Sequence, residues 1–377
     1  MNGKVNIDKN SPLRIPIRVI IAGGGTGGHI FPAIAIANAL KQLEPDIVIL
    51  FVGAKGKMEM EKVPQAGYKI EGLDIAGLNR SSLTKNILLP FKLIKSFFQV
   101  KKIIHSFKPD AVVGVGGYSS YPVLRYAQLK HIPTFIHESN SFAGKSNILL
   151  GKHATKIFVA GVGMERFFKS NKLMITGNPV RMEIANLNIT KKEALQFFGL
   201  DESKRTLLVV GGSLGAKSIN EVIASHLFDF GDLNIQLIWQ TGSYNADAYI
   251  QSGRAYKNVW VGKFIEQMEM GYAAADVVIS RAGAMAVTEL CVVKKPVIFV
   301  PFPFASEDHQ TVNAKHLVDR NAALIVKDSE ASLKLFSVAI DLLFDDSRQQ
   351  ELKQNIAPLA IVNADEIIAN QILNTIR

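Results

Sequence analysis

The fold is indicated by the stretch Arg18-Val19-Ile20-Ile21-Ala22-Gly23-Gly24-Gly25-Thr26-Gly27-Gly28-His29. Its apolar start predicts a buried strand, and its glycines predict a tight turn. The residues after the glycines are expected to begin a helix. Glycines in such a turn adopt positive φ angles and bring backbone N–H groups close to a ligand. Because the N-terminal end of a helix is electropositive, we expect this turn to favour a phosphate or another anion.

The same unit occurs again in the second half of the chain, where Leu207-Leu208-Val209-Val210 precedes Gly211-Gly212-Ser213-Leu214-Gly215. A length of 377 residues is enough for two domains, each with a full core. Two copies of the unit therefore predict two similar α/β domains that face each other across a cleft. Such an arrangement suits an enzyme that joins an anionic donor to a second substrate.

Apolar strand-like runs alternate with helix-like segments along the chain, which predicts right-handed βαβ units and parallel sheets with helices on both faces. The other predicted strands are 47–52, 111–115, 134–137, 156–160, 174–176, 206–210, 235–240, 259–261, 277–280 and 297–300. A proline after a short strand ends regular structure at Asn178-Pro179, so the predicted domains are 1–178 and 179–364. The last helical stretch, 365–377, could pack on either domain, and we assign it to the first.

Composition excludes some classes of protein and leaves others open. The net charge of +10 suits an anionic partner: a nucleic acid, an acidic membrane surface or a phosphorylated substrate. A single cysteine, Cys291, excludes an internal disulfide and a cysteine-rich metal site. The sequence contains no D-x-D motif at a strand end and no H-E-x-x-H motif, so we expect no bound metal. Residues 1–16 lack an apolar signal core, and we expect a cytoplasmic protein.

The glycines at 23, 25 and 28 match the dinucleotide fingerprint G-x-G-x-x-G. That fingerprint also requires an acidic residue at the end of the next strand, where it holds the ribose. The next predicted strand ends at residues 50–55 without a carboxylate, and Asp46 lies at its wrong end. An NAD-dependent oxidoreductase is therefore disfavoured. A glycine turn that serves only close helix–strand packing remains an alternative.

His29 follows the first glycine turn, at the ligand-facing end of the predicted sheet. An imidazole takes up a proton near neutral pH, and a helix N-terminus favours its neutral form. His29 is therefore a candidate general base, or else a residue that contacts substrate or supports the loop. The polar segments 114–120 and 137–140 close neighbouring strands and are expected to converge on the same crevice.

The second half repeats this pattern at residues 280–289, and Glu289 lies in the first two turns of the predicted helix. Its carboxylate could accept hydrogen bonds from ribose hydroxyls, or simply complement the helix dipole. The loop 301–314 carries polar side chains that could bind sugar hydroxyls or cap a helix.

A helix predicted to begin at Pro90 carries two apolar stripes. Leu93, Phe97, Val100, Ile104 and Phe107 form the first stripe, which is expected to face the core. The second stripe consists of Phe91, Ile94 and Phe98, with Lys95, Lys101 and Lys102 beside it. Apolar side chains flanked by lysines suit shallow docking on an anionic membrane. The alternative is a helix that is buried on two sides.

Five motifs in this order resemble those of the MurG family, the UDP-N-acetylglucosamine:lipid I N-acetylglucosaminyltransferases of peptidoglycan synthesis. The motifs are residues 24–32, Gly116-Gly117-Tyr118, His137-Glu138 with Asn140, residues 177–181 and Gly211-Gly212-Ser213. The resemblance implies a GT-B fold, in which two Rossmann-like, doubly wound domains face a central cleft. It also implies an inverting hexosyltransferase without a cofactor, which moves N-acetylglucosamine (GlcNAc) from UDP-GlcNAc to the 4-hydroxyl of lipid I and gives lipid II.

The resemblance also implies roles for the two domains. Domain 1–178 would bind lipid I and the membrane, and domain 179–364 would bind the donor. The implied catalytic base is His29 or, as second candidate, Glu138, and the implied acceptor site contains Gly25, Tyr118 and Glu138. The implied donor residues are Thr26, Gly27, Gly28, Asn140, Arg181, Ser213, Ile265, Ala284, Met285, Ala286, Val287, Thr288, Glu289 and Gln310. The implied membrane contacts are Phe91, Ile94, Lys95, Phe98 and Lys102.

The expected setting is the cytoplasmic face of the bacterial inner membrane, to which the protein would bind peripherally. The expected partners are UDP-GlcNAc, lipid I, an anionic membrane surface and proteins of cell-wall synthesis, cell shape and cell division, but no nucleic acid. The first alternative is another GT-B enzyme on UDP-sugars, an epimerase or a glycolipid synthase. An NAD-dependent oxidoreductase and a non-catalytic basic binding protein are further alternatives.

Overall fold

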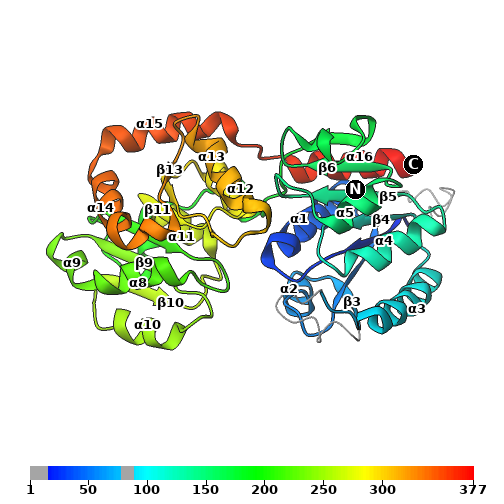
Figure 1. The fold of residues 1–377 in the computed structure, drawn as a ribbon, viewed down its shortest axis with the longest axis horizontal. Helices are drawn as coiled ribbons and strands as arrows, with labels where there is room; N and C mark the ends of the chain where they lie inside the picture. Colours follow the sequence, from blue (N-terminus) through cyan, green and yellow to red (C-terminus); the bar gives the residue numbers. More distant parts are fainter. Residues whose placement is uncertain (1–15, 78–88) are drawn as a thin grey trace, which may run out of the picture.

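Two parallel β-sheets form the centres of two α/β domains that lie side by side (Figure 1). The structure is a computed structural model that describes residues 16–77 and 89–377. The strands of the first sheet are β1 (Arg18–Ala22), β2 (Val48–Ala54), β3 (Lys69–Leu73), β4 (Ala111–Gly114), β5 (Thr134–Glu138), β6 (Lys156–Val159) and β7 (Leu173–Ile175). Those of the second are β8 (Thr206–Val210), β9 (Gln236–Gln240), β10 (Val259–Gly262), β11 (Val277–Ser280), β12 (Val297–Phe299) and β13 (Leu324–Ile325).

The two sheets share one topology. The first has the order β3-β2-β1-β4-β5-β6-β7, and the second has the order β10-β9-β8-β11-β12-β13. In each sheet the strand order reverses beside the strand that precedes a glycine loop, β1 or β8. Ligands of doubly wound sheets bind at this reversal, outside the carboxyl ends of the strands. The predicted fold class is confirmed, and each strand predicted from the sequence is present within two residues of its expected bounds.

Helices cover both faces of each sheet. They are α1 (Gly27–Leu43), α2 (Glu59–Gln65), α3 (Leu89–Phe107), α4 (Ser120–Leu129), α5 (Lys145–Gly151), α6 (Met182–Ala185), α7 (Lys191–Phe198), α8 (Lys217–Ser225), α9 (Leu227–Asp232), α10 (Ala246–Gly253), α11 (Met268–Ala274), α12 (Ala284–Val293), α13 (His309–Val318), α14 (Ala331–Phe344), α15 (Asp346–Ile356) and α16 (Ala364–Ile376). The central strands, such as β1, β4, β5, β8 and β11, are almost wholly buried, as expected for parallel sheets with covered faces, whereas the edge strands β3, β7, β10 and β13 are partly exposed.

The C-terminal helix α16 returns to the first domain and lies against α1 (Figure 1). Its apolar side chains, among them Ile368, Ile372 and Leu373, belong to the same buried cluster as Ile36 and Leu40 of α1. The segment Asp346–Ile376 is long and apolar enough to cross a membrane by composition alone. It is interrupted between α15 and α16, however, and these apolar side chains pack inside the protein.

The two apolar stripes of helix α3 differ in burial. Val100 and Ile104 of the first stripe are buried in the first domain. Phe91, Ile94 and Phe98 of the second are exposed, at 71%, 56% and 68% of their full surface. The alternative that this helix is buried on two sides is therefore wrong, and the second stripe faces solvent.

Candidate active site

The glycine loop after β1 and the loop after β4 pack backbone against backbone. The amide of Gly24 donates to the carbonyl of Gly116 over 3.4 Å. A Cβ atom on Gly117 would lie 2.4 Å from the carbonyl oxygen of Gly24, and the φ of Gly117 is +83°. Only glycine combines this φ with such a close approach. The loops are therefore held in contact at the carboxyl edge of the first sheet.

The imidazole of His29 lies between these two loops. Its Nδ1 is 3.1 Å from the carbonyl oxygen of Gly24. A carbonyl can only accept a hydrogen bond, so Nδ1 carries the proton and Nε2 keeps its lone pair. Burial lowers the pKa of His29, while the charge of Glu138, the Gly24 carbonyl and the charge of Glu59 oppose that shift. The ring is thus neutral at neutral pH and able to accept a proton at Nε2.

Gly116 leaves the space that the imidazole occupies. A Cβ atom there would lie 2.8 Å from both Nε2 and Cδ2 of His29, and the φ of Gly116 is +97°. We expect Gly116→Ala to displace the imidazole of His29, the candidate base, and to lower turnover about 100-fold, the scale of misplacing a catalytic group by about 1 Å. Steady-state kinetics with the wild type as reference, together with the melting temperature, would check this. Turnover equal to the wild type in the folded variant would contradict it.

The carboxylate of Glu138 is surrounded by donors. Its Oε1 accepts from the backbone N and from Nδ2 of Asn140 over 3.1 and 3.2 Å. Its Oε2 accepts from the backbone N of Gly144 and from Nδ2 of Asn147, both over 2.9 Å. A carboxylate that already accepts four hydrogen bonds is better suited to fixing a loop than to removing a proton. Glu138 orients Asn140 in this arrangement.

Glu59 lies at the same place, and the sequence reasoning overlooked it. Its carboxylate is 1% exposed and accepts hydrogen bonds from the amides of Gly25 and Ala54. It therefore occupies an amide that the sequence suggested for a ligand. The available signal was a carboxylate at the start of α2, five residues beyond the end of β2 and outside the segment 50–55 in which a ribose carboxylate was expected.

The first helix carries Thr26, Gly27 and Gly28 beside this cluster. Thr26 is the N-cap of α1, and its Oγ1 lies 3.4 Å from Nδ1 of His29. Tyr118 is partly buried and packs near Gly25, since a Cβ on that glycine would lie 3.9 Å from the Tyr118 ring. The structure thus brings the predicted residues of the first domain together, apart from those on α3.

In the second domain, the loop 211–215 packs against the loop 241–244. A Cβ atom on Gly215 would lie 2.4 Å from the carbonyl oxygen of Thr241. The backbone N and Oγ of Ser243 both donate to the carbonyl of Ser213. Helix α8 begins directly after the glycine loop, so its electropositive end lies beside Ser213. The second strand–glycine–helix unit is present as predicted.

Glu289 and Arg181 form an ion pair where α6 meets α12. Their closest atoms, Arg181 Nη2 and Glu289 Oε1, are 3.5 Å apart, and the exposed fractions of the side chains are 20% and 10%. Tyr272 Oη donates to Glu289 Oε2 over 2.9 Å, a contact that the sequence reasoning missed. Burial raises the pKa of Glu289, and the charge of Arg181 acts against this. The guanidinium also lies 4.5 Å from the ring centre of Phe31 in the first domain.

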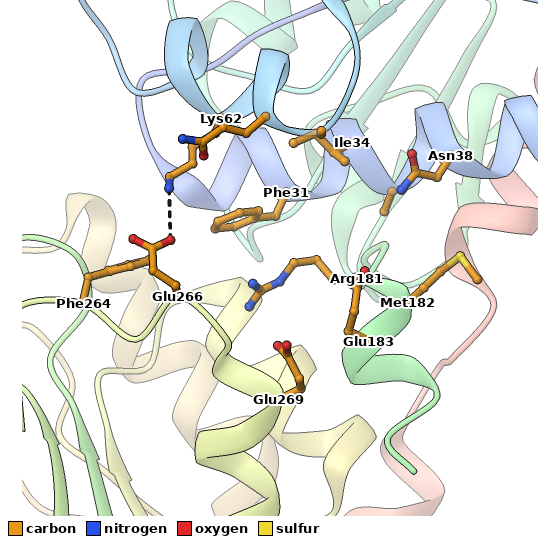
Figure 2. Close-up of a pocket in the computed structure, with 13 residues that line it drawn as sticks. Phe31, Ile34, Asn38, Lys62, Arg181, Met182, Glu183, Phe264, Glu266 and Glu269 are labelled. Atoms are coloured by element: carbon orange, nitrogen blue, oxygen red, sulfur yellow. Dashed lines mark hydrogen bonds and ion pairs between the residues drawn. The ribbon is translucent and has the colours of Figure 1, made fainter. Parts of the chain in front are cut away.

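A cavity of about 440 Å³ lies between the two domains (Figure 2). Phe31, Ile34 and Lys62 line it from the first domain, and Phe264, Glu266 and Glu269 from the second, with Arg181 pointing into the space between them. Lys62 Nζ reaches Glu266 Oε2 across the cavity over 3.2 Å. Three carboxylates, those of Glu183, Glu266 and Glu269, line the cavity together with Arg181 and Lys62, so its charges are mixed, and its two aromatic rings could contact a flat ring.

The remaining predicted donor residues lie in α12, in the segment after β10 and in α13. Ile265 is buried next to Phe264, and its amide donates to Gln240 Oε1 over 2.9 Å. Ala284, Val287 and Thr288 line a second interdomain cavity of about 360 Å³. Met285 and Ala286 belong to the first turn of α12. Gln310 Oε1 accepts from the amide of Phe302, so its oxygen is engaged within the loop.

Comparison with known proteins agrees with this geometry. Residues 19–159 match the glycosyltransferase family 28 N-terminal domain, and residues 206–370 match the glycosyltransferase family 28 C-terminal domain. The chain is 49% identical over 359 residues to the UDP-N-acetylglucosamine--N-acetylmuramyl-(pentapeptide) pyrophosphoryl-undecaprenol N-acetylglucosamine transferase of Phocaeicola vulgatus, covering 94% of this chain and 96% of that protein. The chain belongs to the MurG family.

Solved structures support the same assignment. MurG of Acinetobacter baumannii is 30% identical, with a TM-score of 0.71 over 95% of this chain and 100% of that one. The Neisseria meningitidis UDP-GlcNAc 2-epimerase, solved with UDP-GlcNAc, has a TM-score of 0.65 but only 16% identity over 95% of this chain and all of that one. The second similarity shows a shared fold alone. The expected resemblance to MurG is confirmed, and the protein is a glycosyltransferase of peptidoglycan synthesis.

Proposed function

We propose that this MurG family member transfers GlcNAc from UDP-GlcNAc to lipid I and so forms lipid II. The observation that carries the proposal is the 49% identity to the Phocaeicola vulgatus transferase over nearly the full length of both chains. An epimerase on UDP-GlcNAc is the alternative that the fold permits, but its identity to this chain is 16%.

We place the donor in the cleft beside the second domain. The amides of the loop 211–215 and the N-terminal end of α8 would face the diphosphate. The cavity beside Arg181 offers one guanidinium among carboxylates and an aromatic wall that includes Phe264. Charge that develops on the departing diphosphate would be stabilised by fixed amide dipoles without the participation of a metal ion.

His29 is the proposed general base. The acceptor 4-hydroxyl attacks the anomeric carbon on the face opposite UDP, the bond from that carbon to the UDP oxygen breaks, and the configuration inverts. The hydroxyl proton passes to Nε2, the ring nitrogen that keeps its lone pair. The geometry favours His29 over Glu138, because four donors already occupy the Glu138 carboxylate.

Release of UDP measures the proposed activity directly. We expect rapid release from UDP-GlcNAc when a lipid I analogue is present, and release at least about 100-fold slower without it, because closure of a glycosyltransferase site limits hydrolysis. Equal release with and without the analogue would contradict a role as lipid I transferase. Formation of a second UDP-sugar without any acceptor would favour the epimerase.

We also propose that α3 docks the protein on the cytoplasmic face of the inner membrane. Phe91, Ile94 and Phe98 are exposed on one face of α3, and Lys101 and Lys102 are exposed on the same helix. Lys95 is exposed as well, although its Nζ lies 2.9 Å from Asp74. Apolar side chains with lysines nearby combine insertion with attraction to anionic lipids. Proteins of cell-wall synthesis and division remain proposed partners.

Replacing Phe91, Ile94 and Phe98 together with serine is expected to weaken binding to phosphatidylglycerol vesicles about 100-fold, since each side chain contributes roughly 1 kcal/mol when partly inserted. Cosedimentation at several salt concentrations would measure this. Leu333→Ser is the control, because Leu333 is even more exposed, at 83%, but lies on α14 in the second domain. If the triple variant bound as tightly as the control, the membrane role of α3 would be refuted.

A further inference from the structure

The carboxylate of Glu59 fills the position under the first glycine loop. Its Oε2 accepts from the amide of Gly25 over 2.8 Å, and its Oε1 accepts from the amide of Ala54 over 2.9 Å. Two glycines leave room for it: a Cβ atom on Gly24 would lie 2.3 Å from the carboxyl carbon, and one on Gly53 would lie 2.5 Å from Cγ. The Glu59 carboxylate therefore fits under the loop only because positions 24 and 53 are glycines.

Glu59 and His29 bind opposite ends of one peptide group. The peptide between Gly24 and Gly25 presents its N–H to Glu59 and its carbonyl oxygen to Nδ1 of His29, over 2.8 and 3.1 Å. A carboxylate that accepts from the N–H end polarises the peptide and makes its oxygen a stronger acceptor, because linked hydrogen bonds reinforce one another. The negative charge of Glu59 thereby strengthens the bond that orients the imidazole.

We propose that Glu59 is a positioning residue, which fixes His29 with its proton on Nδ1 through the Gly24–Gly25 peptide. In a Ser-His-Asp triad the carboxylate contacts the histidine directly, whereas here one peptide group stands between them. The charge of Glu59 favours the imidazolium that forms when Nε2 takes the acceptor proton. This inference rests on the proposed role of His29 as the base.

The two carboxylates near His29, those of Glu59 and Glu138, have different hydrogen-bond partners. Glu138 holds Asn140 and the loop up to Asn147. Glu59 instead binds the very peptide to which His29 donates. The charge of Glu59 also acts on Tyr118, because it adds to burial in raising the pKa of Tyr118. A loss of charge at Glu59 should therefore lower the pKa of His29.

Glu59→Gln tests the proposal, with Glu61→Gln as control, since Glu61 is an exposed carboxylate on the same helix. We expect Glu59→Gln to lower kcat about 10- to 100-fold, the usual cost of removing an orienting partner, with the Kd for UDP unchanged. The acid limb of the pH–rate profile should move to lower pH, because His29 loses a charge that favours its protonated form. Glu61→Gln should behave as the wild type.

A spectroscopic readout separates positioning from mere support of the fold. The protein would be labelled with ¹⁵N-histidine, and the His29 signals would be identified by their absence from His29→Ala. These signals should show the Nδ1–H tautomer in the wild type and a mixture of the two tautomers in Glu59→Gln. An unchanged tautomer and acid limb, whatever happens to kcat, would overturn the proposal. If Glu59→Gln does not fold, Glu59→Asp can replace it, because aspartate keeps the charge but is one methylene shorter. Wild-type kcat in Glu59→Asp would also overturn the proposal.

A wild type without transfer activity would instead refute the proposed function, and the tautomer of His29 would still test the role of Glu59.

Discussion

Replacement of His29 by alanine is expected to lower kcat for GlcNAc transfer by about 10²- to 10⁴-fold, the usual contribution of a general base. The reason is geometric: Nδ1 is engaged by Gly24, so Nε2 is left to take the acceptor proton. The Kd for UDP should stay within about twofold, since the cavity beside Arg181 does not include the imidazole. Steady-state kinetics with a lipid I analogue and calorimetric titration with UDP measure the two quantities.

The pH dependence gives an independent check on His29. Burial places the pKa of His29 below its ordinary value of 6.5. A base must be neutral to act, so kcat/KM should fall as the pH drops through this lowered pKa and should be level above it. His153→Ala is the control, since His153 is an exposed histidine of the same domain. An alanine variant at position 29 that keeps wild-type turnover would exclude His29 as the base.

Replacement of Arg181 by methionine is expected to destabilise the protein by roughly 3 kcal/mol, because it leaves the buried Glu289 carboxylate without its cation. The pKa of Glu289 is already raised by burial, and losing Arg181 raises it further. The loss of stability should therefore be small well below the ordinary pKa of 4.5, where Glu289 is protonated in the folded and in the unfolded protein, and should grow as the pH rises through the raised pKa. Denaturant unfolding at several pH values measures this.

The same substitution removes positive charge from the wall of the interdomain cavity. We expect the Kd for UDP to rise about tenfold, the scale of one charge-assisted hydrogen bond. The double variant Arg181→Met/Glu289→Gln is the control: it should recover most of the stability at neutral pH, because no buried charge remains, but not the UDP affinity. A single variant as stable as the wild type at pH 8 would show that the ion pair has no structural role.

Much of the architecture was predictable because it depends on local patterns. Buried strands are recognisable in a sequence as apolar runs, and both glycine loops follow such runs. The sequence therefore predicted β1, β8 and the helices after them. The predicted stripe on α3 also follows from helical spacing alone. Strand β3 was missed because Lys69-Ile70-Glu71-Gly72-Leu73 contains two charges and a glycine, and β13 because it has only two residues.

The connections inside the site were less predictable, because they join residues that are distant in the sequence. The proposed choice of His29 over Glu138 as the base depends on the donors around Glu138, which the sequence does not reveal. The contact of Tyr272 with Glu289 depends on the packing of α11 against α12. Glu59 acts through a peptide group of another loop, and no spacing rule connects it with His29.

The structure of the reaction product tests the central claim most directly. The purified protein would be incubated with UDP-GlcNAc and a lipid I analogue, and the lipid product analysed by mass spectrometry and by proton NMR of the new anomeric centre. The account predicts one added GlcNAc per lipid, in β-linkage to the muramyl 4-hydroxyl, with one UDP released. An unmodified lipid beside consumed UDP-GlcNAc, or an α-linked product, would contradict it.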